Sequence, residues 1–188
     1  DRYLATTCAE VVHVQEHHVP SDQLDFYVQS LHNDGWKAAL TSAVPSDSGG
    51  TGTTGGAGVL VRRQIGLEQV QPEAGTDAWT IVEGRAAAAV VQAAFRQGYL
   101  ALSLYLVTGC SLNDIRNWEI LLRVATVINA LGIPFCIAGD WQNTPECLKA
   151  NGFLDLIGGI VISSPNGTCR SSHTGLYRTI DFFVVSET

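Results

Sequence analysis

The sequence predicts an α/β (α+β) protein in which two mixed β-sheets pack against each other and helices flank them. Strand-like segments are frequent and partly follow one another as hairpins, while three helices are interspersed among them. Hydrophobic residues make up 46% of the 188 residues and charged residues 15%, which suits one large domain with its own core. No internal repeat and no linker divides the chain.

A strand and a helix are predicted at the start of the chain. Residues 9–15 have the β-branched content of a strand, and His13 within it is expected to be a core histidine. After Pro20, Ser21 is expected to cap a helix that Gly35 ends. The apolar face of this helix consists of Leu24, Val28 and Leu31.

Two strands are predicted at residues 36–43 and 57–63, on either side of a loop. The loop, residues 46–56, is rich in Ser, Gly and Thr and lacks the Lys of a phosphate-binding P-loop. It therefore predicts a flexible connection.

Residues 80–83, 86–95 and 99–106 are expected to form three more strands in succession. The middle segment is rich in Ala and would suit a helix by propensity alone. Gly84 and Gly98 bound this segment and no capping residue precedes it, which favours a strand.

The clearest helix lies in the second half of the chain. Asn113 or Ser111 is expected to cap it, and Gly132 is expected to end it. Its apolar stripe consists of Trp118, Leu121, Leu122, Ala125, Ile128 and Leu131.

The strongest functional signal follows that helix. Residues 133–138 form a short apolar run, which predicts a strand buried on both faces that delivers Asp140 into a polar turn. A carboxylate at the carboxyl end of a buried strand is where α/β enzymes place their chemistry. The alternative role for Asp140 is to cap the short helix that is expected from Thr144 to Gly152.

The end of the chain predicts two strands, at residues 160–163 and 179–186, and Asp181 lies near the start of the second. Residues 166–176 between them are polar and predict a loop.

Charge and cysteine content narrow the possible partners. The net charge of −7 argues against tight non-specific DNA binding by this domain alone, although metal-binding carboxylates would add to the same balance. The five Cys are odd in number and include no CxxC pair, which disfavours a zinc site and indicates a reducing, intracellular compartment, cytoplasmic or nuclear. No apolar stretch is long enough to span a membrane and no signal peptide opens the chain, so no membrane partner is expected.

Five segments resemble, in the right order, the motifs of the endonuclease/exonuclease/phosphatase superfamily, which includes apurinic endonucleases and DNase I. They are similar to a strand that ends in a metal-binding Glu, a Gly-rich strand, a strand with a phosphate-contacting Tyr, a Gly-Asp-aromatic-Asn-x-x-Pro motif and an Ile-Asp-aromatic strand. The chain looks most like the endonuclease domains of retroelement polyproteins. The five segments are residues 11–17, 55–63, 102–105, 139–145 and 178–186.

The resemblance implies a four-layered DNase I-like sandwich and a Mg²⁺- or Mn²⁺-dependent phosphodiesterase acting on nucleic acid, with DNA as the expected substrate and no obligate protein partner. Glu16 would bind the metal ion, and Asp140 would orient or deprotonate the attacking water. Tyr105 would hydrogen-bond the phosphate, and Asp181 would orient a catalytic His. This chemistry agrees with elementary requirements, because hard carboxylate oxygens suit Mg²⁺ and the phosphoryl oxygens need charge neutralisation.

The chain departs from the family pattern in two ways. Gln142 stands where the family has Asn, and its extra methylene moves the amide by about 1 Å, which can cost about 10²-fold in rate. Asn143 is the alternative source of that amide. The family's early Asn and its late Asp-His have no counterpart, so residues 1–188 are expected to be a single domain of a longer sequence, without its first and last strands. His173 is the first candidate to replace the missing His, although its polar loop favours a surface role.

Two other functions stay open. One is a degenerate, non-catalytic member of the fold that serves as a binding module, which Gln142, the missing Asp-His and the acidic charge favour. The other is a phosphatase for small phosphoesters, because the loops that select a substrate carry no recognisable motif.

Overall fold

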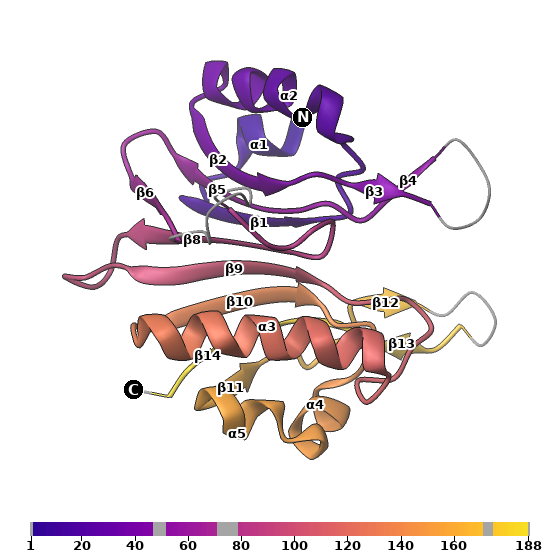
Figure 1. The fold of residues 1–188 in the computed structure, drawn as a ribbon. Coiled ribbons are helices and arrows are strands. Elements are labelled where there is room, and N and C mark those ends of the chain that lie inside the picture. Colours follow the sequence, from indigo (N-terminus) through magenta and orange to yellow (C-terminus); the bar gives the residue numbers. More distant parts are fainter. Residues whose placement is uncertain (1, 47–51, 71–78, 171–174, 188) are drawn as a thin grey trace.

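The described chain folds into four layers, with helices outside and two sheets between them (Figure 1). The structure, a computed structural model, describes residues 2–46, 52–70, 79–170 and 175–187. Two helices cover the smaller sheet and three cover the larger one, which confirms the expected sandwich. The helices are α1 (Arg2–Thr6), α2 (Ser21–Asn33), α3 (Ile115–Leu131), α4 (Pro145–Asn151) and α5 (Phe153–Ile157). Neither α1 nor α5 was predicted.

The smaller sheet has three strands in the order β1-β5-β2. Both strand pairs are antiparallel. The prediction that this sheet mixes parallel and antiparallel strands is therefore wrong. The central strand is buried along most of its length, while β1 lies at an edge and is only partly buried. The strands are β1 (Val11–Gln15), β2 (Trp36–Thr41) and β5 (Ala57–Arg62), close to the predicted segments.

The larger sheet has seven strands and is mixed. Its order is β11-β14-β10-β9-β8-β6, with β7 paired to β8, and only the β9–β10 pair is parallel. Strand β6 was not predicted. The strands are β6 (Gly66–Gln69), β7 (Thr80–Val82), β8 (Ala86–Gln92), β9 (Tyr99–Tyr105), β10 (Phe135–Asp140), β11 (Gly159–Ile162) and β14 (Asp181–Ser186).

The Ala-rich segment is strand β8, as predicted. Ala86 and Ala88 pack in the core beneath α3, while Ala89 and Val91 pack against Val59 of the smaller sheet. Both faces of β8 are therefore covered. Tertiary packing of this kind outweighs the helix propensity of Ala.

The predicted helix caps need correction. Pro20, not Ser21, is the N-cap of α2, and no side chain caps this end. Asp114, not Asn113 or Ser111, is the N-cap of α3, and its carboxylate accepts a hydrogen bond from the backbone N–H of Arg116. Several cap-forming residues stand side by side before α3, so residue type alone could not choose among them.

The buried face of α3 is also rotated from the predicted stripe. Leu122 is 42% exposed, whereas Ile120 and Val124 are buried. Asn117 is fully buried on the same face, because its side chain bonds to the preceding loop. The end of the helix is as predicted, since Gly132 has a left-handed φ of 59°.

The two segments that were expected to be loops, residues 46–56 and 166–176, each contain one strand of a short hairpin, and the paired strand lies just outside the segment. The hairpins extend from the end of the sandwich at which β9 and β10 terminate (Figure 1). The paired strands are β3 (Val44–Pro45) with β4 (Thr53–Thr54), and β12 (Cys169–Arg170) with β13 (Tyr177–Arg178).

His13 is a satisfied core histidine, as expected. It lies between the sheets, where its Nδ1 donates to the carbonyl of Leu102 over 3.1 Å and its ring meets Phe183 edge-on. Burial lowers the pKa of His13 to about 4, so the ring is neutral at physiological pH.

In the described part of the chain, no helix is long and apolar enough to cross a membrane. The single domain lacking its terminal strands stays a prediction.

Candidate active site

Four strand ends meet at one end of the sandwich. Asp140, the last residue of β10, pairs with Tyr105 of β9 on one side and with Asp181 of β14 on the other. Glu16 directly follows β1 of the smaller sheet, and its carboxylate is a neighbour of the Tyr105 hydroxyl that raises the pKa of that group. The structure therefore brings together Glu16, Tyr105, Asp140 and Asp181, which lie far apart in the sequence.

Two residues at these strand ends have an unusual backbone. Glu16 and Gln142 both have a φ of 54°, in the left-handed region that side chains other than Gly rarely adopt. Glu16 directly follows β1, and Gln142 lies two residues after the end of β10. Such local strain is concentrated at functional sites, where the surrounding structure maintains it.

The support beneath Glu16 is a buried link between the two sheets. Gln15 donates from its amide to the hydroxyl of Ser103, over 2.8 Å, and to the carbonyl of Ala138, over 3.1 Å. Ser103 in turn donates to the carbonyl of Val14 over 2.7 Å. These bonds fix the end of β1 to β9 and β10 and so determine where Glu16 stands.

His17, the next residue, has a structural role. Its Nδ1 accepts from the N–H of Val19 and its Nε2 donates to the carbonyl of Thr41, so both ring nitrogens are occupied. Burial lowers the pKa of His17, which favours this neutral tautomer. A Cβ at Gly56 would lie 2.5 Å from the ring, which explains the glycine at this point of the Gly-rich strand.

Asp140 has the most perturbed acidity of the site. Its pKa is raised from 3.8 to about 6, mainly by burial and also by the negative charges of Asp181 and Glu16, while hydrogen bonds from Gln142 act in the opposite direction. A carboxyl group with this pKa is mostly ionised at pH 7 and accepts a proton more readily than an ordinary Asp. This is the property that a general base requires.

Gln142 provides the amide beside Asp140. Its backbone N–H donates to one carboxylate oxygen over 3.1 Å and its side-chain amide donates to the other over 2.7 Å. Asn143 instead donates to the carbonyls of Cys110 and Trp141, over 3.1 and 3.2 Å. The amide nitrogen of Asn143 therefore faces the backbone. The helix cap at Thr144 is separate, so Asp140 does not cap α4.

Tyr105 and Arg85 add hydrogen-bonding and positive charge. Burial raises the pKa of the Tyr105 hydroxyl, and the neighbouring Glu16 carboxylate also raises it. The Thr108 hydroxyl lies 3.1 Å from the Tyr105 oxygen, and the Arg85 guanidinium lies 4.8 Å from the ring centroid. The pair could therefore present a donor and a cation to a phosphate.

Arg85 was missed by sequence reasoning, although a signal existed. The hairpin order of the predicted strands places the start of residues 86–95 opposite the end of residues 99–106. In the structure the N–H of Tyr105 donates to the carbonyl of Arg85 over 2.8 Å. The residue that precedes the Ala-rich strand was therefore a neighbour of Tyr105 by topology.

Asp181 stands at the exposed side of the site. The backbone N–H groups of Ile180 and Asp181 both donate to the hydroxyl of Thr168, which fixes the turn into β14. In the described chain, no hydrogen bond joins Asp181 to a histidine. His173 lies outside the described residues.

The side chains fit a divalent cation that is held by few protein ligands. Among the described residues, no group of three or more His, Cys, Asp and Glu is arranged to hold a metal ion. Mg²⁺ does not require one, because it keeps several waters and binds through one or two carboxylates together with substrate phosphates. Glu16 is exposed, and the charges of Glu16 and Asp181 that raise the pKa of Asp140 are those that a cation would neutralise.

Comparison with known proteins gives similarity at the level of structure alone. No protein-family model matches the chain, and no curated protein is significantly similar in sequence. The catalytic domain of Xenopus laevis APE2 superposes with a TM-score of 0.64 at 14% identity over 99% of this chain and 76% of its own. D. rerio TDP2 in complex with a single-strand DNA product superposes with a TM-score of 0.55 at 15% identity, over 100% of this chain and 74% of its own. A mannosyl-6-phosphatase of Bacteroides thetaiotaomicron superposes with a TM-score of 0.58 at 13% identity, over 95% of this chain and 72% of its own.

The chain thus has the DNase I-like fold of the endonuclease/exonuclease/phosphatase superfamily. A protein in complex with a single-strand DNA product and a mannosyl-6-phosphatase share this fold with it, so the fold itself does not select a substrate.

Proposed function

We propose that this chain is a Mg²⁺- or Mn²⁺-dependent phosphodiesterase that acts as a nucleic-acid endonuclease, the kind of domain found in retroelement polyproteins. The observation that carries the proposal is the meeting of Glu16, Tyr105 and Asp140 at one end of the sandwich, where the pKa of Asp140 is raised to about 6. Three of the predicted side chains thus lie where one phosphodiester could contact all of them. An intracellular location is part of the proposal.

Each side chain has a role that follows from its surroundings. Glu16 is the metal ligand, and a bound Mg²⁺ would supply charge neutralisation at the phosphoryl oxygens. Asp140 accepts a proton from the attacking water, while Gln142 holds the carboxylate oriented by two hydrogen bonds. Tyr105 donates a hydrogen bond from its hydroxyl to a phosphate oxygen and keeps its proton, because its pKa is raised. Asp181 provides an acceptor at the exposed edge of the site.

Nucleic acid is the proposed substrate because a basic, aromatic element adjoins the site. Residues 156–180 contain no Asp or Glu, although the chain as a whole has a net charge of −7. In the β12–β13 hairpin, Tyr177 is 66% exposed and the Arg170 guanidinium lies 6.0 Å from its ring. Exposed aromatic and Arg side chains bind single-stranded nucleic acid by stacking and charge.

The test is nicking of supercoiled plasmid DNA with Mg²⁺ or Mn²⁺ by the wild-type chain and by Asp140→Ala and Glu16→Gln variants. We expect nicking by the wild type that is lost in EDTA and reduced at least about 100-fold by Asp140→Ala. Equal nicking by the wild type and Asp140→Ala would exclude Asp140 from the reaction.

Two alternatives are tested separately. A non-catalytic module is favoured by the net charge of −7 and by Gln142 in the place of the family's Asn, and titration calorimetry should then detect no Mg²⁺ or Mn²⁺ binding. A phosphatase for small phosphoesters is the second alternative, because a mannosyl-6-phosphatase has the same fold and the fold does not select the substrate. Release of phosphate from sugar phosphates without cleavage of DNA would establish the phosphatase.

A further inference from the structure

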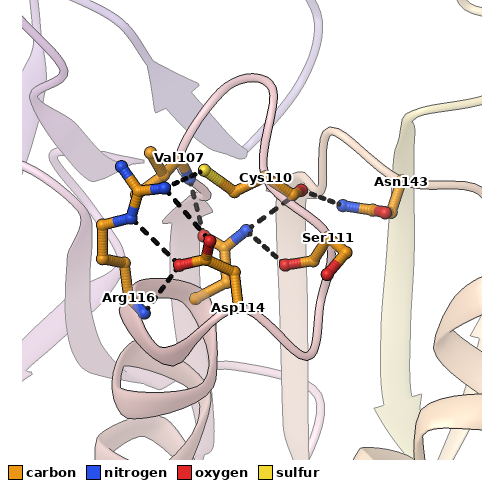
Figure 2. A network of polar contacts seen from close by, with 7 residues as sticks. Val107, Cys110, Ser111, Asp114, Arg116 and Asn143 are labelled. Atoms are coloured by element: carbon orange, nitrogen blue, oxygen red, sulfur yellow. Dashed lines mark hydrogen bonds and ion pairs between the residues drawn. The ribbon is translucent and has the colours of Figure 1, made fainter.

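A buried asparagine organises the loop that follows β9. Asn117 lies in the first turn of α3 and is fully buried. Its side-chain oxygen accepts from the N–H of Val107 over 2.8 Å, and its amide donates to the carbonyls of Ser111 and Cys110 over 3.1 and 3.3 Å. Both polar atoms of the side chain are therefore used, and residues 107–111 are closed into a compact turn (Figure 2).

One carbonyl joins this loop to the loop that follows β10. The carbonyl of Cys110 accepts a second hydrogen bond from the amide of Asn143 over 3.1 Å (Figure 2). The same amide donates to the carbonyl of Trp141 over 3.2 Å. We refer to Asn117, the Cys110 carbonyl and Asn143 as the loop tether.

Each tethered loop carries part of the candidate site. The first includes Thr108, whose hydroxyl lies 3.1 Å from the Tyr105 oxygen. The second includes Gln142, whose two hydrogen bonds orient the carboxylate of Asp140. The tether therefore connects the loop beside the Tyr105 hydroxyl with the loop beside Asp140, the proposed base. Asn117 itself contacts neither of these two groups.

We infer that Asn117 is a positioning residue for the proposed phosphodiesterase, an inference that rests on the proposed function. Through the loop tether it holds the Tyr105 hydroxyl and the Asp140 carboxylate at a fixed separation. Misplacement of about 1 Å costs about 10²-fold in rate. The tether should therefore affect kcat more than KM.

The contacts of Arg116 on the outside of the same loop supply a matched control. The Arg116 guanidinium donates to the carboxylate of Asp114 over 2.9 and 3.0 Å and to the sulfur of Cys110 over 2.8 Å (Figure 2). The side chain of Arg116 is 61% exposed. Arg116→Ala removes these contacts but leaves the bonds to the Cys110 carbonyl in place.

The kinetic test compares Asn117→Ala, Asn143→Ala, their double variant and Arg116→Ala at equal folded concentration and saturating Mg²⁺. We expect each tether variant to lower kcat by about 10–100-fold with little change in KM, and Arg116→Ala to stay within about twofold. The kcat of the double variant should lie within about twofold of the kcat of the slower single variant, because both substitutions break the same connection. Full kcat in Asn143→Ala, or fully multiplicative effects, would overturn the inference.

Amide hydrogen exchange provides a measurement that does not depend on activity. Asn117→Ala should accelerate exchange at residues 141–143, and Asn143→Ala should accelerate it at residues 107–111, while Arg116→Ala should do neither. If Asn117→Ala does not fold, Asn143→Ala alone decides. If the wild type cleaves no better than Asp140→Ala, the proposed function fails, and unchanged exchange across the two loops would separately refute the tether.

Discussion

The acidity of Asp140 depends on three neighbours. Asp181 and Glu16 disfavour its charge, whereas Gln142 favours it, and burial is the largest influence on its pKa. The family resemblance pointed to these residues but could not give the balance between them. That balance depends on burial and on the backbone of Gln142, which has a φ of 54°. Neither quantity can be read from a sequence motif.

Asp140→Asn should stabilise the protein at alkaline pH. The pKa of Asp140 is raised from 3.8 to about 6, so its favourable contribution is present below pH 4 and is lost as the pH rises through 6. A shift of about two units corresponds to about 2.7 kcal/mol, which we reduce to about 1 kcal/mol because the group is partly exposed and screened.

Urea unfolding in EDTA measures this difference. The free energy of unfolding of Asp140→Asn should exceed that of the wild type by about 1 kcal/mol at pH 8 and should match it near pH 4. A gain of equal size at both pH values would mean that the charge of Asp140 is not its cause.

Gln142→Ala should move the acid limb of the pH–rate profile to higher pH. The side-chain amide of Gln142 stabilises the ionised form of Asp140 over 2.7 Å, so its loss should raise the pKa above about 6. Gln142→Asn, which keeps an amide and tolerates the positive φ, is the control and should move the limb less. A limb that stays in place or moves to lower pH in Gln142→Ala would contradict this account.

At the level of elements, strands were predictable and connections were not. The apolar run 133–138 and the Ala-rich run 86–95 showed their burial directly in their composition, and both are strands of the larger sheet. The hairpins β3–β4 and β12–β13 could not be predicted, because their pairing involves only two residues in each strand. Helix α5 was missed because it has only five residues, bounded by Gly152 and Gly158.

Tyr177→Ala should weaken binding of nucleic acid without affecting the chemistry. Stacking of a base on an aromatic ring contributes about 1–3 kcal/mol, so KM for a DNA substrate should rise by about tenfold or more. Cleavage of a small phosphodiester, bis(p-nitrophenyl) phosphate, should be unchanged. Leu176→Ala, at a neighbouring residue that is 68% exposed, is the control without an aromatic face. Equal effects of both variants would remove the stacking role.

At the scale of the molecule, the two main sheets are unequal, with three strands facing seven in the described part of the chain. Part of the larger sheet is therefore uncovered, and its edge strand β11 exposes Ile160 and Ile162, at 45% and 52%. Beside it, a groove of about 620 Å³ extends between β1 and β14. The apolar run at residues 133–138 predicted a strand buried on both faces, but the number of strands in each sheet was not readable from local sequence.

This uncovered edge should cause self-association. Unpaired edge strands with apolar side chains pair with other chains, whereas an edge Lys prevents such pairing. We expect the weight-average sedimentation coefficient of the wild type to rise with concentration, and Ile162→Lys to reduce the rise. Leu122→Lys, which changes a 42% exposed residue on α3 in the same way, should leave the rise unchanged. Concentration-independent sedimentation of the wild type would rule out association through this edge.

The four strand ends of the site have a consequence for folding kinetics. Glu16, Tyr105, Asp140 and Asp181 are separated by tens of residues, and the parallel β9–β10 pair closes only after the whole of α3 has been bridged. Such long-range pairing gives a high contact order, for which folding takes about milliseconds to seconds. During refolding, secondary structure should therefore form well before the carboxylates of the candidate site come together, and recovery of the proposed activity should lag behind recovery of the circular dichroism signal.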